Sequence, residues 1–164
     1  MDRPAAADPP GLSDVPGVLG IDHVGIAVPD LEAAISFHTD TFGLVLLHRE
    51  VNPDQGVAEA MLGAPGAGPE AAQVQLLAPI EAGSPLHRFL DRSGPGLQQL
   101  AYRVADVDAV CAELRRRGLR LLYDSAQTGT RGSRINFLHP RDAGGVLVEL
   151  VEPAASAIGR PSGD

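Results

Sequence analysis

The stretch His23–Ala34, HVGIAVPDLEAA, returns in altered form at Gln99–Val110, QLAYRVADVDAV. In both copies an apolar run precedes an aspartate that opens a helical pattern, which predicts a strand followed by a helix. A second pair of stretches, VQLLAP at 74–79 and VELVEP at 148–153, follows in the same order and at nearly the same offset. Short amphipathic units resemble one another by chance, but ordered matches of this kind favour an internal duplication.

The duplication predicts the same series of elements twice. In the first half we expect a strand, a helix and three strands, at 20–28, 30–41, 44–51, 57–64 and 72–79. A short helix is expected within 84–94, and the second half is expected to contain a strand at 97–104, a helix at 106–118, a strand at 119–123, a loop at 124–132 and strands at 133–140 and 145–153. Each half is therefore a βαβββ module. We expect an α+β fold in which two modules, at about 20–80 and 96–153, form one curved mixed sheet around a metal site.

The length and composition predict a single domain. The chain has 164 residues, of which 44% are hydrophobic, and this suffices for one core. Both ends are rich in Pro, Ala, Gly and Ser. We therefore expect a domain at 18–153, a disordered N-terminal tail at 1–17 and a flexible C-terminal tail at 154–164.

The charge and the cysteine content exclude several classes of partner and location. The 13 basic and 21 acidic residues give a net charge of -8, which argues against a nucleic-acid or membrane partner. The single cysteine, Cys111, predicts that the chain has no internal disulfide. The sequence also contains no apolar run of the roughly 18 residues that a membrane span needs. Together these features predict a cytoplasmic location.

Four polar strand positions are paired by the duplication, His23 with Gln99 and Gln75 with Glu149. We expect all four to face the concave side of the sheet, where small molecules bind in such folds. One imidazole nitrogen, two amide oxygens and a carboxylate suit a divalent cation in an open octahedral site. Each residue also has a structural explanation, because a lone strand histidine is often a core residue and a strand glutamine often faces water. Gln98 is expected to point to the opposite face of its strand.

Glu59 is a further candidate, since it lies among small apolar residues in the expected strand at 57–64. A glutamate in the middle of a strand can simply face solvent. If its strand belongs to the same curved sheet, however, Glu59 could face the cavity opposite Glu149. Two carboxylates on either side of one carbon atom are what the removal and return of a proton requires.

These residues resemble the vicinal oxygen chelate superfamily and, more closely, its methylmalonyl-CoA epimerases. The resemblance extends over about residues 20 to 153 and is carried by segments such as IDHVGIAV, NPDQGVAEAML, QVQLLAP, GLQQLAYRV and SRINFLHPRDAGGVLVEL. The first of these segments is general to the superfamily. NPDQGVAEAML and SRINFLHPRDAGGVLVEL are more specific to the epimerases.

The resemblance implies metal ligands at His23, Gln75 and Glu149 and proton-transfer carboxylates at Glu59 and Glu149. The fourth ligand of the family is commonly a histidine, but this chain has Gln99 there. An amide oxygen is a harder ligand than imidazole, so cobalt, manganese or magnesium is favoured over zinc.

The implied substrate is methylmalonyl-CoA, epimerised at C2. Donors for its phosphates are expected at Arg49, Arg131, Ser133 and Arg134. The resemblance also suggests a homodimer.

Two alternatives use the same cavity. One is another metalloenzyme of the superfamily, such as a glyoxalase or a ring-cleaving dioxygenase. The dioxygenases typically offer two histidines and a carboxylate to iron, whereas this site has one histidine. The other alternative is a metal-free binding protein, in which the polar positions only line a pocket.

Overall fold

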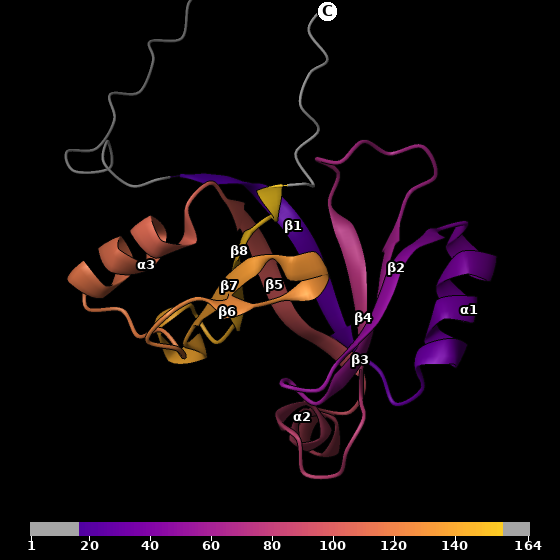
Figure 1. Ribbon diagram of the computed structural model, residues 1–164. Helices are drawn as coiled ribbons and strands as arrows, with labels where there is room; N and C mark the ends of the chain where they lie inside the picture. Colours follow the sequence, from indigo (N-terminus) through magenta and orange to yellow (C-terminus); the bar gives the residue numbers. More distant parts are fainter. Residues whose placement is uncertain (1–16, 156–164) are drawn as a thin grey trace, which may run out of the picture.

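The computed structural model describes residues 17–155, which form one mixed sheet with three α-helices (Figure 1). The first half comprises β1 (Val18–Ala27), α1 (Leu31–Phe42), β2 (Val45–Asn52), β3 (Val57–Gly63) and β4 (Gln73–Pro79). After α2 (Pro85–Ser93), the second half comprises β5 (Gly96–Val104), α3 (Val107–Arg116), β6 (Gln127–Thr128), β7 (Arg134–Leu138) and β8 (Val148–Glu152), with short 3-10 turns at 130–132 and 140–142. The predicted tails lie almost entirely outside the described residues, so their flexibility stays a prediction.

The two long helices begin as the sequence predicts. The side chains of Asp30 and Asp106 accept hydrogen bonds from the backbone N–H groups of Ala33 and Ala109, at 3.0 and 2.9 Å. These contacts satisfy donors that the first helical turn otherwise leaves unpaired. Gly43 ends α1 with φ of 68°, a conformation that glycine adopts without steric cost.

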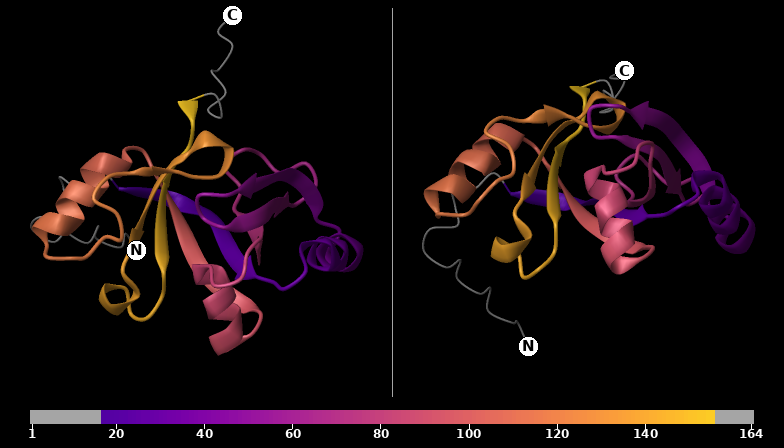
Figure 2. Two further views of the ribbon diagram at one scale, coloured as in Figure 1. Left: turned by 60° about the horizontal axis from the view of Figure 1, so that its bottom comes forward. Right: turned by 90° about the horizontal axis from the view of Figure 1, so that it is seen from below.

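The sheet has the strand order β2-β3-β4-β1-β5-β8-β7-β6. At its centre β1 and β5 are antiparallel, while β1 pairs in parallel with β4 and β5 in parallel with β8. Each half therefore repeats the pairing of the other, and Figure 2 shows the sheet curling between the two halves. The predicted α+β fold, two βαβββ modules in one curved mixed sheet, is confirmed.

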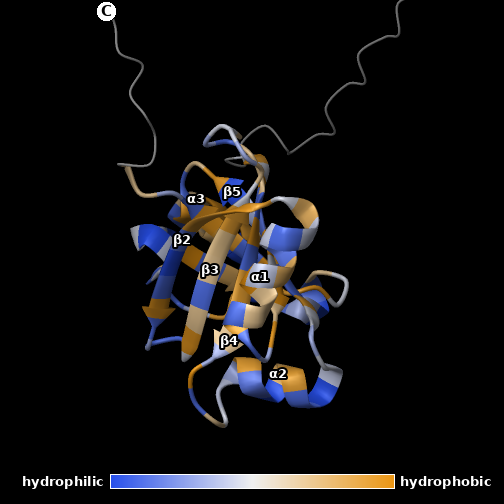
Figure 3. Ribbon diagram, turned by 90° about the vertical axis from the view of Figure 1, so that its right-hand side faces the viewer, coloured by the Kyte–Doolittle hydropathy of each residue, from blue (hydrophilic) through white to orange (hydrophobic). Residues whose placement is uncertain are grey.

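The helices pack mainly by half. Figure 3 shows the side of the molecule on which α1 lies over β3 and β4. Leu31 of α1 packs there with Leu62 of β3 and Leu76 of β4. In the second half α3 buries Val107 and Val110 against strand residues such as Leu150. The polar residues of β4 and β8 alternate with these apolar ones and so point to the inner face of the sheet. None of the helices within residues 17–155 is long and apolar enough to cross a membrane.

The prediction of a strand at 119–123 is wrong. This segment makes only an isolated bridge, between Leu121 and Leu138, and the short strand β6 forms instead within the predicted loop. The reason is the side chain of Asn136, which is fully buried. Its amide accepts a hydrogen bond from the N–H of Tyr123 and donates one to the carbonyl of the same residue. These contacts occupy backbone groups of Tyr123 that a continuing ladder would need.

The absence of a side chain at Gly25, which is paired with Gln99 across the β1–β5 pair, predicts a stability effect. A Cβ atom added to Gly25 would lie 2.5 Å from Cγ of Gln99, so Gly25→Ala forces the glutamine to move. We expect a loss of about 1–3 kcal/mol in the free energy of unfolding, measured by urea denaturation. The control is Gly20→Ala on the same strand, because a Cβ there meets nothing within 4 Å. Equal stability of the two variants would contradict this packing.

Candidate functional site

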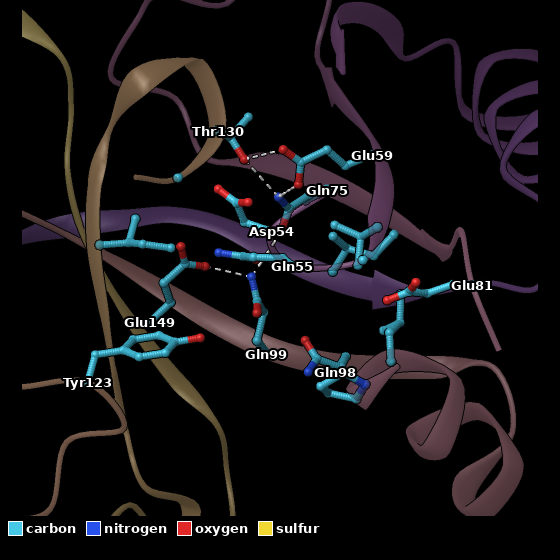
Figure 4. Close-up of a pocket in the computed structure, with 17 residues that line it drawn as sticks. Asp54, Gln55, Glu59, Gln75, Glu81, Gln98, Gln99, Tyr123, Thr130 and Glu149 are labelled. Carbon is cyan, nitrogen blue, oxygen red and sulfur yellow. Dashed lines mark hydrogen bonds between the residues drawn. The ribbon is translucent and has the colours of Figure 1, made fainter. Parts of the chain in front are cut away.

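Four buried polar side chains meet on the inner face of the sheet, each from a different strand. They are His23 on β1, Gln75 on β4, Gln99 on β5 and Glu149 on β8, all at most 8% exposed. Alternation along each strand directs them inward, and the pairing of β1 with β5 brings the two halves together. The structure thus assembles the four positions that the duplication pairs, and Figure 4 shows three of them.

The side-chain nitrogen of Gln99 lies at the meeting point of the other three residues. It is 2.6 Å from Oε2 of Glu149, 3.0 Å from Oε1 of Gln75 and 3.3 Å from Nε2 of His23. Three atoms capable of binding a cation therefore converge on a group with partial positive charge. Rotation of the Gln99 amide by half a turn would exchange its nitrogen for its oxygen, which is itself a cation ligand.

A hydrogen-bonded chain behind His23 holds the imidazole ring. Nδ1 of His23 lies 2.8 Å from Asp22, and Asp22 accepts a hydrogen bond of 2.9 Å from Nε of Arg103. Arg103 also donates to Glu70. Burial acts to lower the pKa of His23, but its hydrogen bonds and attraction to Asp22 and Glu149 outweigh burial and raise it to about 9. A metal cation bound to Nε2 of His23 would have to replace this proton, and the negative charges of Asp22 and Glu149 would stabilise the cation in its place.

The donor set fits a cation of the harder kind. Among residues 17–155, no group of three His, Cys, Asp or Glu side chains is arranged to hold a metal ion. A cation at this point would therefore depend on the amide oxygens of Gln75 and Gln99 together with His23 and Glu149. Oxygen-rich sets of this type suit magnesium, manganese or cobalt better than zinc, which prefers thiolate and imidazole. Metal binding by these residues stays a prediction.

Glu59 lies beside this group, on β3. One oxygen of its carboxylate accepts a hydrogen bond of 2.8 Å from Gln75, and the other accepts one of 2.7 Å from the hydroxyl of Thr130. Burial, opposed in part by the Thr130 hydrogen bond, combines with the charges of Glu50 and Glu149 to raise the pKa of Glu59 to about 7. A carboxyl group with this pKa is able both to accept and to donate a proton near neutral pH.

Two cavities open on either side of the polar group. The α2-side cavity, of about 210 Å³, lies next to α2 and is lined in part by Leu77, Leu86 and Gln99. The Arg103-side cavity, of about 380 Å³, is lined in part by Arg103 and Val151. Glu149 and Thr130 line both cavities, so a ligand at the polar group can extend to either side.

Of the four predicted phosphate donors, two line a cavity and two do not. Arg131 and Ser133 line the Arg103-side cavity. Arg49 instead forms an ion pair with Glu32 of α1, and neither cavity includes it. The fourth residue, Arg134, also lies away from both cavities and pairs with Asp108 and Glu152. A role in substrate binding stays a prediction for all four.

Several residues near the site are ones that sequence reasoning missed, namely Asp22, Glu50, Arg103, Tyr123 and Thr130. Asp22 directly precedes His23, and this proximity was the only local signal for any of them. The expected orientation of Gln98 is also wrong, because Gln98 lines the α2-side cavity (Figure 4). The pairing of β1 with β5 shifts register between Gln99 and Leu97, so Gln98 occupies a β-bulge that breaks the alternation.

Comparison with known proteins agrees with this architecture. Residues 22–137 match the glyoxalase/bleomycin resistance protein/dioxygenase superfamily, and this match covers most of the chain. The chain belongs to this superfamily. An ethylmalonyl-CoA/methylmalonyl-CoA epimerase of Cereibacter sphaeroides is 36% identical over 132 residues, which cover 79% of this chain and 95% of the relative.

Solved structures of this superfamily lead to the same group of relatives. The methylmalonyl-CoA epimerase of Mycobacterium tuberculosis is 57% identical, with a TM-score of 0.80 over 85% of this chain and 91% of that one. A methylmalonyl-CoA epimerase in complex with methylmalonyl-CoA and NH4+ is 45% identical, with a TM-score of 0.81 over 85% and 97% of the two chains. The homologues and structural neighbours of the chain therefore include methylmalonyl-CoA epimerases.

The hydrogen-bonded series His23–Asp22–Arg103 predicts that substitutions of two arginines will destabilise the protein to different extents. Arg103→Met keeps the aliphatic packing but removes the guanidinium from Asp22, whose side chain is only 16% exposed. We expect a loss of about 3 kcal/mol in the free energy of unfolding, because a largely buried carboxylate loses its partner. The control is Arg134→Met, whose ion pairs are exposed and should contribute less than about 1 kcal/mol. Similar losses in the two variants would show that burial of the Asp22 pair does not matter.

Proposed function

We propose that the protein is a methylmalonyl-CoA epimerase, which interconverts the R and S forms of the thioester at C2. The observation that carries this proposal is the position of Glu59 and Glu149, two buried carboxyl groups on different strands, within the group of polar side chains around Gln75 and Gln99. The named activities of the relatives support the same substrate. The homodimer and the cytoplasmic location stay predictions.

The reaction needs a base and an acid on opposite sides of one carbon. The C2 proton lies between a thioester and a carboxylate, so its removal leaves an enolate that is stabilised by delocalisation. A divalent cation held by His23, Gln75, Gln99 and Glu149 would supply Lewis-acid stabilisation of the negative charge, worth several kcal/mol. Cobalt, manganese and magnesium fit this donor set better than zinc.

Glu59 and Glu149 would share the proton transfer. One carboxylate removes the C2 proton, and the carboxyl group of the other returns a proton to the opposite face. The hydrogen bonds from Gln75 and Thr130 fix the carboxylate of Glu59 in place, and its pKa of about 7 leaves both protonation states populated. Epimerisation in either direction requires one group in each state. Glu149 would combine this role with that of a cation ligand.

The proposed mechanism predicts incorporation of solvent deuterium at C2. We expect protein reconstituted with cobalt or manganese to exchange the C2 proton of methylmalonyl-CoA in heavy water while it epimerises the substrate, followed by proton NMR. Metal-stripped protein and a reaction without protein are the controls for metal dependence and spontaneous exchange. Full activity of the stripped protein would refute metal dependence, and epimerisation without the label would refute the enolate mechanism.

Glu59→Gln tests the first carboxyl group. The amide has the same shape but cannot accept the proton, so we expect epimerisation to fall by about 10²–10⁴-fold. Metal content and thermal stability should stay close to those of the unchanged protein. The control is Glu32→Gln, because Glu32 is exposed on α1, pairs with Arg49 and lines neither cavity. Retained activity in Glu59→Gln would remove this residue from the mechanism.

A further inference from the structure

We propose that Glu50 is a positioning residue for the proton transfer, which acts by holding the 130–132 turn, and with it Thr130, against Glu59. The inference rests on the proposed function, in which Glu59 exchanges a proton with C2 of the substrate. Glu50 is not among the described residues that line either cavity, so it does not contact the substrate itself. Its effect on the reaction therefore has to pass through its neighbours.

The 130–132 turn connects the two ends of the curled sheet. It lies between β6 and β7, whereas β2 and β3 are at the opposite end of the strand order, and the curl brings the two ends together (Figure 2). The hydroxyl of Thr130 donates to Glu59 over 2.7 Å, and the backbone N–H of Arg131 donates to Glu50 over 3.2 Å. Glu50 and Glu59 are themselves paired across β2 and β3. Two successive residues of the turn are thus bound to one cross-strand pair.

The two side chains that orient Glu59 differ in how they are supported. Gln75 donates to one carboxylate oxygen from β4, which pairs with β3 along most of its length. Thr130 donates to the other oxygen and belongs to no strand (Figure 4). The ladder of the sheet therefore fixes Gln75, but the position of Thr130 depends on what holds the turn.

The backbone of the turn needs support from outside. Arg131 has φ of 56°, and within residues 17–155 it is the one residue other than glycine with a positive φ. This left-handed conformation is sterically unfavourable for a residue with a Cβ atom, and it persists where surrounding contacts hold it. The hydrogen bond from the N–H of Arg131 to the Glu50 carboxylate is such a contact, and the charge of its acceptor strengthens it.

Glu50 is itself held in the form that accepts this hydrogen bond. His48, two residues earlier on β2, contacts the same carboxylate oxygen, Oε2, that the N–H of Arg131 reaches. Burial acts to raise the pKa of Glu50, but the hydrogen bonds with His48 and with this N–H outweigh burial and lower it. Glu50 is therefore a carboxylate near neutral pH, with one oxygen directed at the turn.

The test compares Glu50→Gln with Glu50→Met. Both substitutions remove the negative charge that helps to raise the pKa of Glu59, so any effect of this charge is common to the two variants. Only glutamine keeps an oxygen that accepts a hydrogen bond from the turn. We expect kcat for methylmalonyl-CoA to be about five- to thirtyfold lower in Glu50→Met than in Glu50→Gln, with KM equal within about twofold. The control is Glu113→Met on α3, which lies away from both cavities and should leave kcat unchanged.

A second pair of variants tests whether Glu50 acts through Thr130. Thr130→Val keeps the shape of the side chain but removes the hydroxyl that donates to Glu59. In the Thr130→Val background, Glu50→Gln and Glu50→Met should have equal kcat, because the group that Glu50 positions is then absent. Hydrogen exchange of the Arg131 amide gives a measurement that does not depend on activity. We expect exchange to be about tenfold faster in Glu50→Met than in Glu50→Gln.

The outcomes separate this inference from the proposed function. Equal kcat in Glu50→Gln and Glu50→Met would show that the hydrogen bond to the turn does not matter and would overturn the inference. A difference that persists in the Thr130→Val background would overturn the route through Thr130. Failure of Glu50→Met to fold, when Glu50→Gln folds, would assign Glu50 to stability and overturn its positioning role. If the unsubstituted protein does not epimerise methylmalonyl-CoA, the proposed function fails, while exchange of the Arg131 amide still decides whether Glu50 holds the turn.

Discussion

The antiparallel pairing of β1 with β5 is the contact on which the rest of the structure depends, because it is the only central pair that joins the two halves in the described part of the chain. It places Gly25 directly opposite Gln99, and the missing side chain of the glycine makes room for the glutamine. Any side chain at position 25 would compete with Gln99 for the same space. The polar group at the centre of the sheet therefore depends on the absence of a side chain at position 25 as well as on the hydrogen bonds of Gln99.

Burial makes this polar group costly, and the structure compensates with nearly complete pairing. Glu149, Gln75 and His23 are each within hydrogen-bond distance of Gln99, and Thr130 and Gln75 occupy both oxygens of Glu59. A buried polar network of this kind specifies one arrangement of the strands, because a shift in register would leave several groups unpaired. The two pKa shifts have different causes: burial raises the pKa of Glu59, whereas the hydrogen bonds and charges of Asp22 and Glu149 raise the pKa of His23 against the effect of burial.

The two βαβββ modules repeat the same strand pairing, but the cavities beside them differ. The parallel pairs β1–β4 and β5–β8 repeat one another, and α1 and α3 pack on their own halves by similar contacts. The cavities at the two ends differ in volume, and carboxylates line both of them, but only the larger one also has arginines among its described lining residues.

Local signals in the sequence determined much of the fold. Asp30 and Asp106 predict the starts of α1 and α3, because each capping carboxylate accepts a hydrogen bond from the first turn of the helix that follows it. Alternation along the strands, together with the repeat, predicted that His23, Gln75, Gln99 and Glu149 face one side, since successive side chains of a regular strand point in opposite directions. Tertiary structure alone decided the rest. The bulge at Gln98, the bridge in place of a strand near Tyr123, and the contact of Thr130 with Glu59 all depend on partners distant in the chain. No local pattern encodes such partners, because their positions are set by how the two halves pack.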